Sequence, residues 1–457
     1  AFHSLIGDWA LASVVVNVIG GTAAVACLYG FARAAFGRTT AFAAAAILAV
    51  HPYAIKFSGD VQSEGLYLGL FLGAVWALWL ALRSASLGAA SVAGLLCGLA
   101  YLTRPEGIGL LAVGGALAAW QAVRGSWSRR RVVVWGALLF LTTALVAGPY
   151  VVWIRADSGV WSLTQKKSVG WVTGLSGPPA RYAREKAAVP PAPEPTVVLP
   201  STPAEPAREA VRPCSAARGL SRYAAALVDL AHSGLQALGP ELFAILLAGG
   251  LIGRWRKLSL RGLFVLGVVG LYGLVLFELT LNVGYVSTRH ALPPVTVALG
   301  HVGAALLAVA GVFSGSRKKV ALALILIALT GVGLVRSLRP DRTDSVAERR
   351  AAEWLRAENL PPGGVAVHRR RIAYYAGAPA VKIPDKPPKN VIVKMRKWGA
   401  EYLIVSDEDI GDYPWLVKAL PERAQLLHRE EANGVTAFVY RLLRKRKPYP
   451  GVEPLLP

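Results

Sequence analysis

The chain has 457 residues, of which 54% are hydrophobic and 17% charged, and this composition excludes an ordinary soluble protein. Several stretches of about 18 residues or more carry few charges, the length that crosses a hydrocarbon core of ~30 Å. The net charge is +23, yet Lys and Arg do not gather into a basic arm, so we expect no nucleic acid partner. We predict a polytopic α-helical membrane protein, with the lipid bilayer as its first partner.

Hydrophobic runs predict about ten spans, at residues 9–32, 41–55, 64–82, 87–103, 106–123, 132–154, 236–253, 261–281, 291–313 and 320–337. Alternate short loops carry most of the basic residues, in clusters such as Arg129 to Arg131. The intervening short loops hold only Lys56, Arg104 and Arg289. Because Lys and Arg of short loops stay on the cytoplasmic side, these three are expected outside, in a protein of the bacterial cytoplasmic (inner) membrane.

The apolar runs and their interruptions divide the chain into five predicted parts. These are a first transmembrane half at 1–154, an external loop with a Pro-rich linker at 155–235, a second transmembrane half at 236–338, a soluble external domain at 339–447, and a basic tail at 448–457.

The soluble external part has the pattern of a small α/β domain. AERRAAEWLRAENL and NVIVKMRKWG read as helices, and GVAVH and AEYLIVS read as buried strands. LVKALP is a short helix, and the runs on either side of Asn433-Gly434 predict a hairpin.

The first candidate site is a polar island, His51 to Glu64, between two apolar runs, which predicts a tight turn at the membrane surface. Charged groups in such a place usually mark a reaction or transport site, and the alternative is a solvated loop. Glu64 and Asp60 are candidate catalytic carboxylates, four residues apart, so on a helical continuation they would share one face. Lys56 is a candidate ligand of a donor phosphate.

The second polar turn is LTRPEG, where Pro105 is expected to set the turn and start the next helix. Arg104 then places a guanidinium fork suited to phosphate at the outer boundary. The alternatives are an interfacial arginine or an internal partner for Glu64 or Glu106.

The third polar turn, NVGYVSTRHALPP, places Tyr285, Arg289 and His290 outside, directly before an apolar run. Arg289 and Tyr285 are candidate donor-phosphate ligands. His290 is expected to be a polar surface or capping residue rather than a catalyst. Together the three turns predict carboxylates and arginines on one face, a set suited to displacing a lipid-linked phosphate: the base accepts a hydroxyl proton and the arginines stabilise the departing charge.

Four stretches carry a resemblance to a known family. HPYAIKFSGDVQSEGLYLGLFL, GLAYLTRPEGI, TRHALPPVTVAL, and WLRAENLPPGGVAV followed by AYYAG resemble polytopic lipid-phosphosugar glycosyltransferases of the GT-C superfamily, in particular the protein mannosyltransferase and aminoarabinose transferase-like group. The resemblance places Glu64 on the family's second acidic site, and Arg104 and Arg289 on basic positions near the lipid phosphate.

The resemblance also implies a principal catalytic Asp in the family's first external loop. AFHSLIGDWALASVVVNVIGG is similar to the end of that loop running into the next span, so we expect an N-terminal truncation and interpret Asp8 as an interfacial residue.

The leading hypothesis is an enzyme that transfers a sugar from a polyprenyl-phosphate-linked donor to a glycan, lipid or protein acceptor at the outer face. The alternative is a transporter or flippase of lipid-linked glycans, and a third reading is an envelope scaffold. The sequence indicates no metal site and no cofactor with certainty. A divalent cation at the cluster SDEDIGD, residues 406–412, is the alternative to a solvated turn there.

Overall fold

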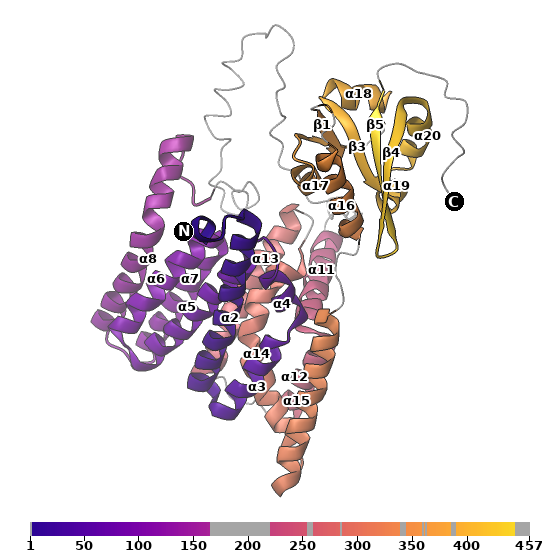
Figure 1. The fold of residues 1–457 in the computed structure, drawn as a ribbon. Coiled ribbons are helices and arrows are strands. Elements are labelled where there is room, and N and C mark those ends of the chain that lie inside the picture. Colours follow the sequence, from indigo (N-terminus) through magenta and orange to yellow (C-terminus); the bar gives the residue numbers. More distant parts are fainter. Residues whose placement is uncertain are drawn as a thin grey trace. The chain divides into compact units, whose positions relative to one another are not determined.

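The computed structural model of the chain forms two compact units (Figure 1). It describes residues 2–164, 220–253, 259–283, 286–338, 344–358, 361, 363–384 and 390–443. Tyr285, singled out in the sequence, lies outside the described residues, and so do Cys214 and the Pro-rich stretch 189–213.

The first unit is all helical. Its elements are α1 (Phe2–Ile6), α2 (Trp9–Phe36), α3 (Arg38–Ala49), α4 (Pro52–Ser58), α5 (Glu64–Ser84), α6 (Leu87–Thr103), the 3-10 helix η1 (Pro105–Ile108), α7 (Gly109–Val123), α8 (Arg129–Ser158), α11 (Leu220–Leu238), α12 (Pro240–Gly253), α13 (Leu260–Val283), α14 (Thr288–Ala310) and α15 (Gly315–Leu338).

The chain is a multi-span helical membrane protein, as the sequence predicted, with about ten spans expected. In the described part of the chain, seven helices are long and apolar enough to cross a membrane, or up to nine if two bent pairs each count as one span. The helix α6 is apolar but has only 17 residues. The pair α3 and α4 bends by 58°, and the pair formed by residues 222–238 and 240–252 bends by 93°. Pro52 and Pro240 follow the two breaks, as expected for a residue that cannot donate the helical N–H bond.

Two local predictions in this unit are corrected. The polar island is not only a turn, because Pro52 starts the helix α4 within it and His51 is buried. The predicted external loop 155–235 contains the last turn of α8 and almost all of α11. That helix is strongly amphipathic, and its residues alternate too often between apolar and polar types to stand out as a hydrophobic run.

Glycines bring α2 and α5 into backbone contact. A Cβ atom on Gly65 would lie 2.5 Å from the carbonyl oxygen of Asn17, and one on Gly69 would lie 2.4 Å from the carbonyl oxygen of Gly20. No side chain fits at such distances, so the two helices pack at the closest separation that small residues permit. This close packing places the turn before α5 directly against α2.

The second unit is an α/β domain with a five-stranded sheet in the order β2-β1-β3-β5-β4. Its strands are β1 (Gly364–Val367), β2 (Ala380–Lys382), β3 (Ala400–Ser406), β4 (Ala424–Ala432) and β5 (Val435–Leu442). Its helices are α16 (Asp344–Ala357), α17 (Arg370–Tyr375), α18 (Val391–Lys397), α19 (Asp407–Asp412) and α20 (Pro414–Arg423).

In this sheet β1 runs parallel to β2 and β3, and β5 runs antiparallel to β3 and β4. One hydrophobic cluster joins α16 and α17 to one face of the sheet, and another joins α18 and α20 to the other face. The predicted α/β class is confirmed, and so is the hairpin, since Asn433 and Gly434 adopt the positive φ angles of 55° and 78° that such a turn requires. The strand β2 and the helices α17 and α19 were not predicted, because each has only three to six residues.

Candidate functional site

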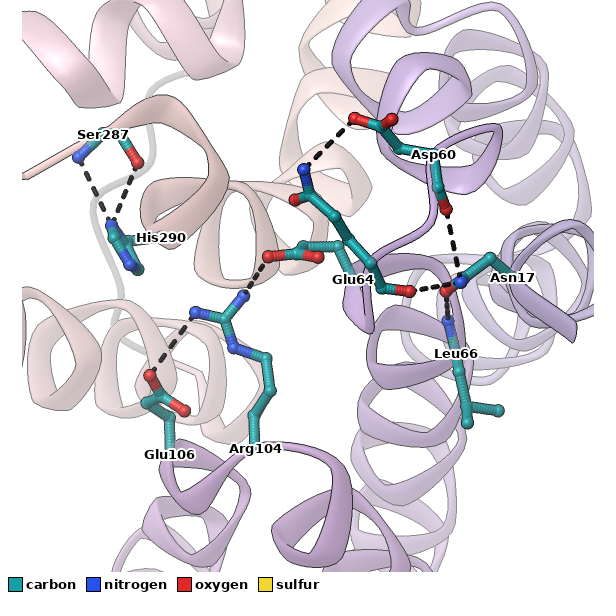
Figure 2. Close-up of polar contacts among 9 residues, drawn as sticks. Asn17, Asp60, Glu64, Leu66, Arg104, Glu106, Ser287 and His290 are labelled. Carbon is teal, nitrogen blue, oxygen red and sulfur yellow. Dashed lines mark hydrogen bonds and ion pairs between the residues drawn. The ribbon is translucent and has the colours of Figure 1, made fainter. Parts of the chain in front are cut away.

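Three charged side chains from two polar turns meet in the first unit (Figure 2). Nη1 of Arg104 lies 3.0 Å from Oε1 of Glu64, and Nη2 of Arg104 lies 3.5 Å from Oε1 of Glu106. The three side chains are 7%, 11% and 23% exposed, in that order. We call this group the carboxylate–arginine cluster.

Local sequence explains how the cluster is formed. Glu64 is the first residue of α5, where a carboxylate interacts favourably with the helix dipole. Arg104 ends α6 with φ −149° and ψ 129°, the extended conformation that a following proline favours. Pro105 then starts η1, which contains Glu106, as the sequence predicted. The proline therefore turns the chain so that Arg104 faces both carboxylates.

Aromatic side chains of α5 and α13 support the cluster. The guanidinium of Arg104 lies 5.5 Å from the ring centre of Tyr67 on α5. On α13, the hydroxyl of Tyr272 donates to the carbonyl oxygen of Glu106 at 2.7 Å. The ring of Phe71 packs edge-on against Tyr272, with centroids 5.3 Å apart. The cluster is thus held in one geometry by the first and the second half of the bundle.

Two carboxylate oxygens of the cluster form no hydrogen bond within it. Oε2 of Glu64 and Oε2 of Glu106 are both buried, and within the described residues neither has a hydrogen-bond partner. A buried polar atom without a partner is costly and rare in folded proteins. Two carboxylate oxygens are therefore positioned to accept a hydroxyl proton or a hydrogen bond from a molecule that enters the site.

The structure bears differently on the four predicted phosphate ligands. Arg104 has the internal partners that the sequence left open as an alternative, Glu64 and Glu106. Arg289 lies at the start of α14, and its Nε is buried without a hydrogen-bond partner among the described residues. The ion pairs found in the described ranges do not join Arg289 to the cluster. Lys56 lies on α4, and Tyr285 falls outside the described residues.

Asp60 and His290 each form hydrogen bonds with residues close to them in the chain. Residues 60–63 are not helical, so Asp60 does not share a helical face with Glu64, contrary to the expectation from their spacing. Oδ2 of Asp60 accepts a hydrogen bond from the side chain of Gln62 at 3.2 Å. His290 forms a capping box with Ser287, whose N–H donates to Nδ1 at 3.4 Å, which agrees with its interpretation as a capping residue.

Asn17, on α2, is a site residue that the sequence reasoning missed. Its side chain is buried, and its amide nitrogen donates to the carbonyl oxygens of Gln62 and Asp60, the latter at 3.4 Å (Figure 2). Its amide oxygen accepts from the N–H of Leu66 at 3.1 Å. The single amide in the apolar run ASVVVNVIGG was the available signal, because polar groups inside a span are usually functional or structural. Asn17 fixes the turn from which Glu64 projects.

The C-terminal domain has a separate buried polar group. Ser406 Oγ donates to Oε1 of Glu348 at 3.3 Å, and Oδ2 of Asp409 accepts from the N–H of Ser406 at 3.3 Å. Burial raises the pKa of Glu348 to about 8, aided by the hydrogen bond and negative charge of Asp409 and opposed by Arg369. Glu348 is therefore protonated at neutral pH.

The solvated turn expected at SDEDIGD is wrong. Residues 407–412 form the helix α19 rather than a solvated turn, with Asp409 buried as part of its cap. Asp407 accepts from the N–H of Thr436 at 3.1 Å. Among the residues that the structure describes, no group of three or more His, Cys, Asp or Glu side chains is placed to hold a metal ion.

Comparisons with known proteins show what this architecture resembles. Residues 1–153, about a third of the chain, match the family model described as dolichyl-phosphate-mannose-protein mannosyltransferase. No curated protein sequence matches the chain significantly.

Solved structures match over nearly the whole chain. The Archaeoglobus fulgidus oligosaccharyltransferase in complex with Zn and sulfate is 15% identical, with a TM-score of 0.56 over 95% of this chain and 61% of that chain. AglB from the same organism, in complex with an inhibitory peptide and a dolichol-phosphate, is 14% identical, with a TM-score of 0.55 over 93% of this chain and 63% of that chain. ArnT from Cupriavidus metallidurans in the apo state is 12% identical, with a TM-score of 0.54 over 94% of this chain and 83% of that chain.

The chain spans about three fifths of the length of the archaeal proteins, and at these identities the likeness concerns the fold. The recognition made from the motifs is confirmed at that level. Residues 1–153 match the sequence pattern of the dolichyl-phosphate-mannose-protein mannosyltransferase family, and the chain shares the fold of the archaeal oligosaccharyltransferase and of ArnT.

Proposed function

We propose that this protein transfers a sugar from a polyprenyl-phosphate-linked donor to a hydroxyl group of a glycan, lipid or protein, at the outer face of the cytoplasmic membrane. The observation that carries the proposal is the carboxylate–arginine cluster, with its two buried carboxylate oxygens that lack partners among the described residues. The family match covers the residues that build it, Glu64, Arg104 and Glu106.

In the proposed reaction the acceptor oxygen attacks the anomeric carbon of the donor sugar. The bond between that carbon and the phosphate oxygen breaks, and the polyprenyl phosphate leaves with the electron pair. The acceptor proton passes to a carboxylate, for which Glu64 and Asp60 are the candidates. Arg289 and Lys56 are candidate cations for the leaving phosphate, and Tyr285 is a further candidate ligand of it.

Arg104 has a different place in this proposal from the one its motif suggested. Two of its nitrogens face Glu64 and Glu106, so its first effect is to hold both carboxylates in a fixed orientation. Phosphate binding by Arg104 would use the rest of the guanidinium fork, and it stays a prediction.

Lipid phosphates bound in two of the similar solved structures support a polyprenyl-phosphate-linked donor. AglB was solved with a dolichol-phosphate, and ArnT from Cupriavidus metallidurans was solved bound to undecaprenyl phosphate. A donor of this type would present its phosphate at the membrane boundary, where the positive-inside pattern places Arg104 and Arg289.

A transporter or flippase of lipid-linked glycans is the second candidate, and one observation favours it. Two broken helices, with bends of 58° and 93°, are the kind of element around which transporters build their sites. A transporter would move the intact glycolipid, whereas the transferase would break the bond between sugar and phosphate.

Full-length protein in lipid nanodiscs, supplied with radiolabelled polyprenyl-phosphate sugars and a membrane extract as acceptor, separates these candidates. The transferase predicts label in the acceptor fraction and free polyprenyl phosphate, with a loss of at least 100-fold in Glu64→Gln. Glu278→Gln is the matched control, because Glu278 is an exposed carboxylate on α13 that bonds Asn282 at 2.6 Å. Glycolipid that crosses the bilayer uncleaved, at the same rate in Glu64→Gln, would contradict the transferase and favour the transporter.

A further inference from the structure

A pocket of about 230 Å³ is formed partly by the turn that carries Arg104. Its lining includes Tyr101 and Thr103 from the end of α6, Pro105 from η1, Tyr150 from α8, and Leu163 and Thr164 from the segment after α8. Two of these residues, Thr103 and Pro105, flank Arg104 in the chain. The pocket and the cluster are therefore built on the same turn. We call this pocket the aromatic pocket.

The aromatic walls of the pocket are held rigidly. Tyr101 is almost fully buried, and its hydroxyl donates to the carbonyl oxygen of Leu163. The ring of Tyr150 meets that of Tyr101 edge-on, with centroids 6.2 Å apart, and stacks on Trp153 at 6.0 Å with an interplanar angle of 18°. Both tyrosines thus keep their orientation without a ligand, which lowers the entropic cost of binding.

The lining combines aromatic surface with a few polar groups. The hydroxyl of Thr103 donates to the carbonyl oxygen of Ala100 at 2.7 Å, so its oxygen can still accept a hydrogen bond from a ligand. Thr164 adds a second hydroxyl to the lining. Small-molecule sites have this composition: mostly apolar walls, with a few polar groups that set orientation.

A pyranose ring matches such a lining. Its C–H faces are apolar and pack on aromatic rings, while its rim of hydroxyls needs hydrogen-bond partners. The volume lies below the ~300 Å³ at which pockets for drug-sized ligands begin, so a single ring fits better than an oligosaccharide. A long isoprenoid chain would need an extended apolar groove instead.

We propose that the aromatic pocket, which shares its turn with Arg104, binds one pyranose ring of a substrate. This inference rests on the proposed function, which supplies two sources for the ring, the donor sugar and a glycan acceptor. In both cases the ring packs against Tyr150.

Direct binding tests the pocket independently of activity. The full-length protein is placed in lipid nanodiscs, because maltoside detergents would supply a competing sugar. Saturation-transfer NMR then uses the methyl glycosides of mannose, glucose, galactose and arabinose as probes. We expect transfer to the ring protons of at least one glycoside. It should fall at least fivefold in Tyr150→Leu and be retained in Tyr150→Phe, which keeps the ring.

The matched control is Phe140→Leu, an exposed aromatic on the same helix outside the pocket lining, which should bind as the wild type does. Absence of signal with all four glycosides, or equal signal in wild type and Tyr150→Leu, would overturn the inference. Displacement of the glycoside by farnesyl phosphate, which has no sugar, would also overturn it by showing an isoprenoid site.

Kinetics identify the source of the ring. In Tyr150→Leu we expect KM to rise at least tenfold for the substrate whose sugar occupies the pocket, with kcat reduced less than threefold. A rise for the donor assigns the donor sugar, and a rise for the acceptor assigns the glycan. Glycoside binding without any transferase activity would refute the proposed function alone, whereas activity with an unchanged KM for both substrates in Tyr150→Leu would refute the pocket alone.

Discussion

Asn17 offers the sharpest test of how this site is held. Replacing it with Leu keeps a similar volume but removes every hydrogen bond of the amide. The N–H of Leu66 and the carbonyl oxygen of Gln62 would then lose partners in a partly buried position. A group left unsatisfied away from water costs about 1–3 kcal/mol, so the loss of two partners should destabilise the turn by about 2–6 kcal/mol. The hydrogen bond to Ser13 O adds little, because that carbonyl already belongs to the α2 ladder.

The expected consequence is local. Glu64 follows this turn directly, so its carboxylate should lose its fixed distance to Arg104 while the bundle remains folded. Hydrogen exchange measured by mass spectrometry should show faster exchange of peptides covering residues 59–68 in Asn17→Leu, with peptides of α8 unchanged. Transfer activity should fall at least tenfold.

A matched substitution separates the amide from the general effect of changing α2. Thr22→Val alters an exposed hydroxyl on the same helix that bonds only the preceding turn, to Val18 O at 2.8 Å, and should leave exchange at residues 59–68 unchanged. Wild-type protection of the Leu66 amide in Asn17→Leu would refute the argument that Asn17 positions Glu64.

Three further predictions follow from the charges. Arg104→Lys should lower activity at least tenfold and reduce thermal stability, because one ammonium cannot contact both carboxylates as the guanidinium fork does. A purified Arg104→Lys protein with normal turnover and a normal melting temperature would remove Arg104 from the site. Cys214, placed outside by the charge bias of the short loops, should react with an impermeant thiol reagent in cells with a permeable outer envelope, and labelling only after lysis would reverse the topology. The free energy of unfolding of the C-terminal domain should fall as pH rises from about 5 to about 8, by up to about 1.4 kcal/mol per pH unit, because over that range folded Glu348 keeps a proton that it loses on unfolding. Thermal unfolding of Glu348→Gln should not show this dependence on pH. An equal dependence in both proteins would exclude Glu348 as its cause.

The sequence by itself determined the features that depend on neighbouring residues. Runs of apolar side chains long enough to cross a bilayer identified a multi-span helical protein, and Pro105 predicted where η1 begins. Two strand-like runs on either side of Asn433-Gly434 identified the hairpin of the α/β domain. Such signals are local, because a hydrophobic period or a turn conformation is encoded within a few residues.

Only the tertiary structure decided which residues meet. The sequence favoured phosphate as the partner of Arg104 and left an internal carboxylate as the alternative. Its contact with Glu64, forty residues away in the chain, depends on how α5 and α6 pack. Asn17 looked like one polar residue in an apolar run until the backbone contacts at Gly65 placed it against the turn before α5. Long-range pairs of this kind are set by the close packing of helices, which no periodicity within a single helix encodes.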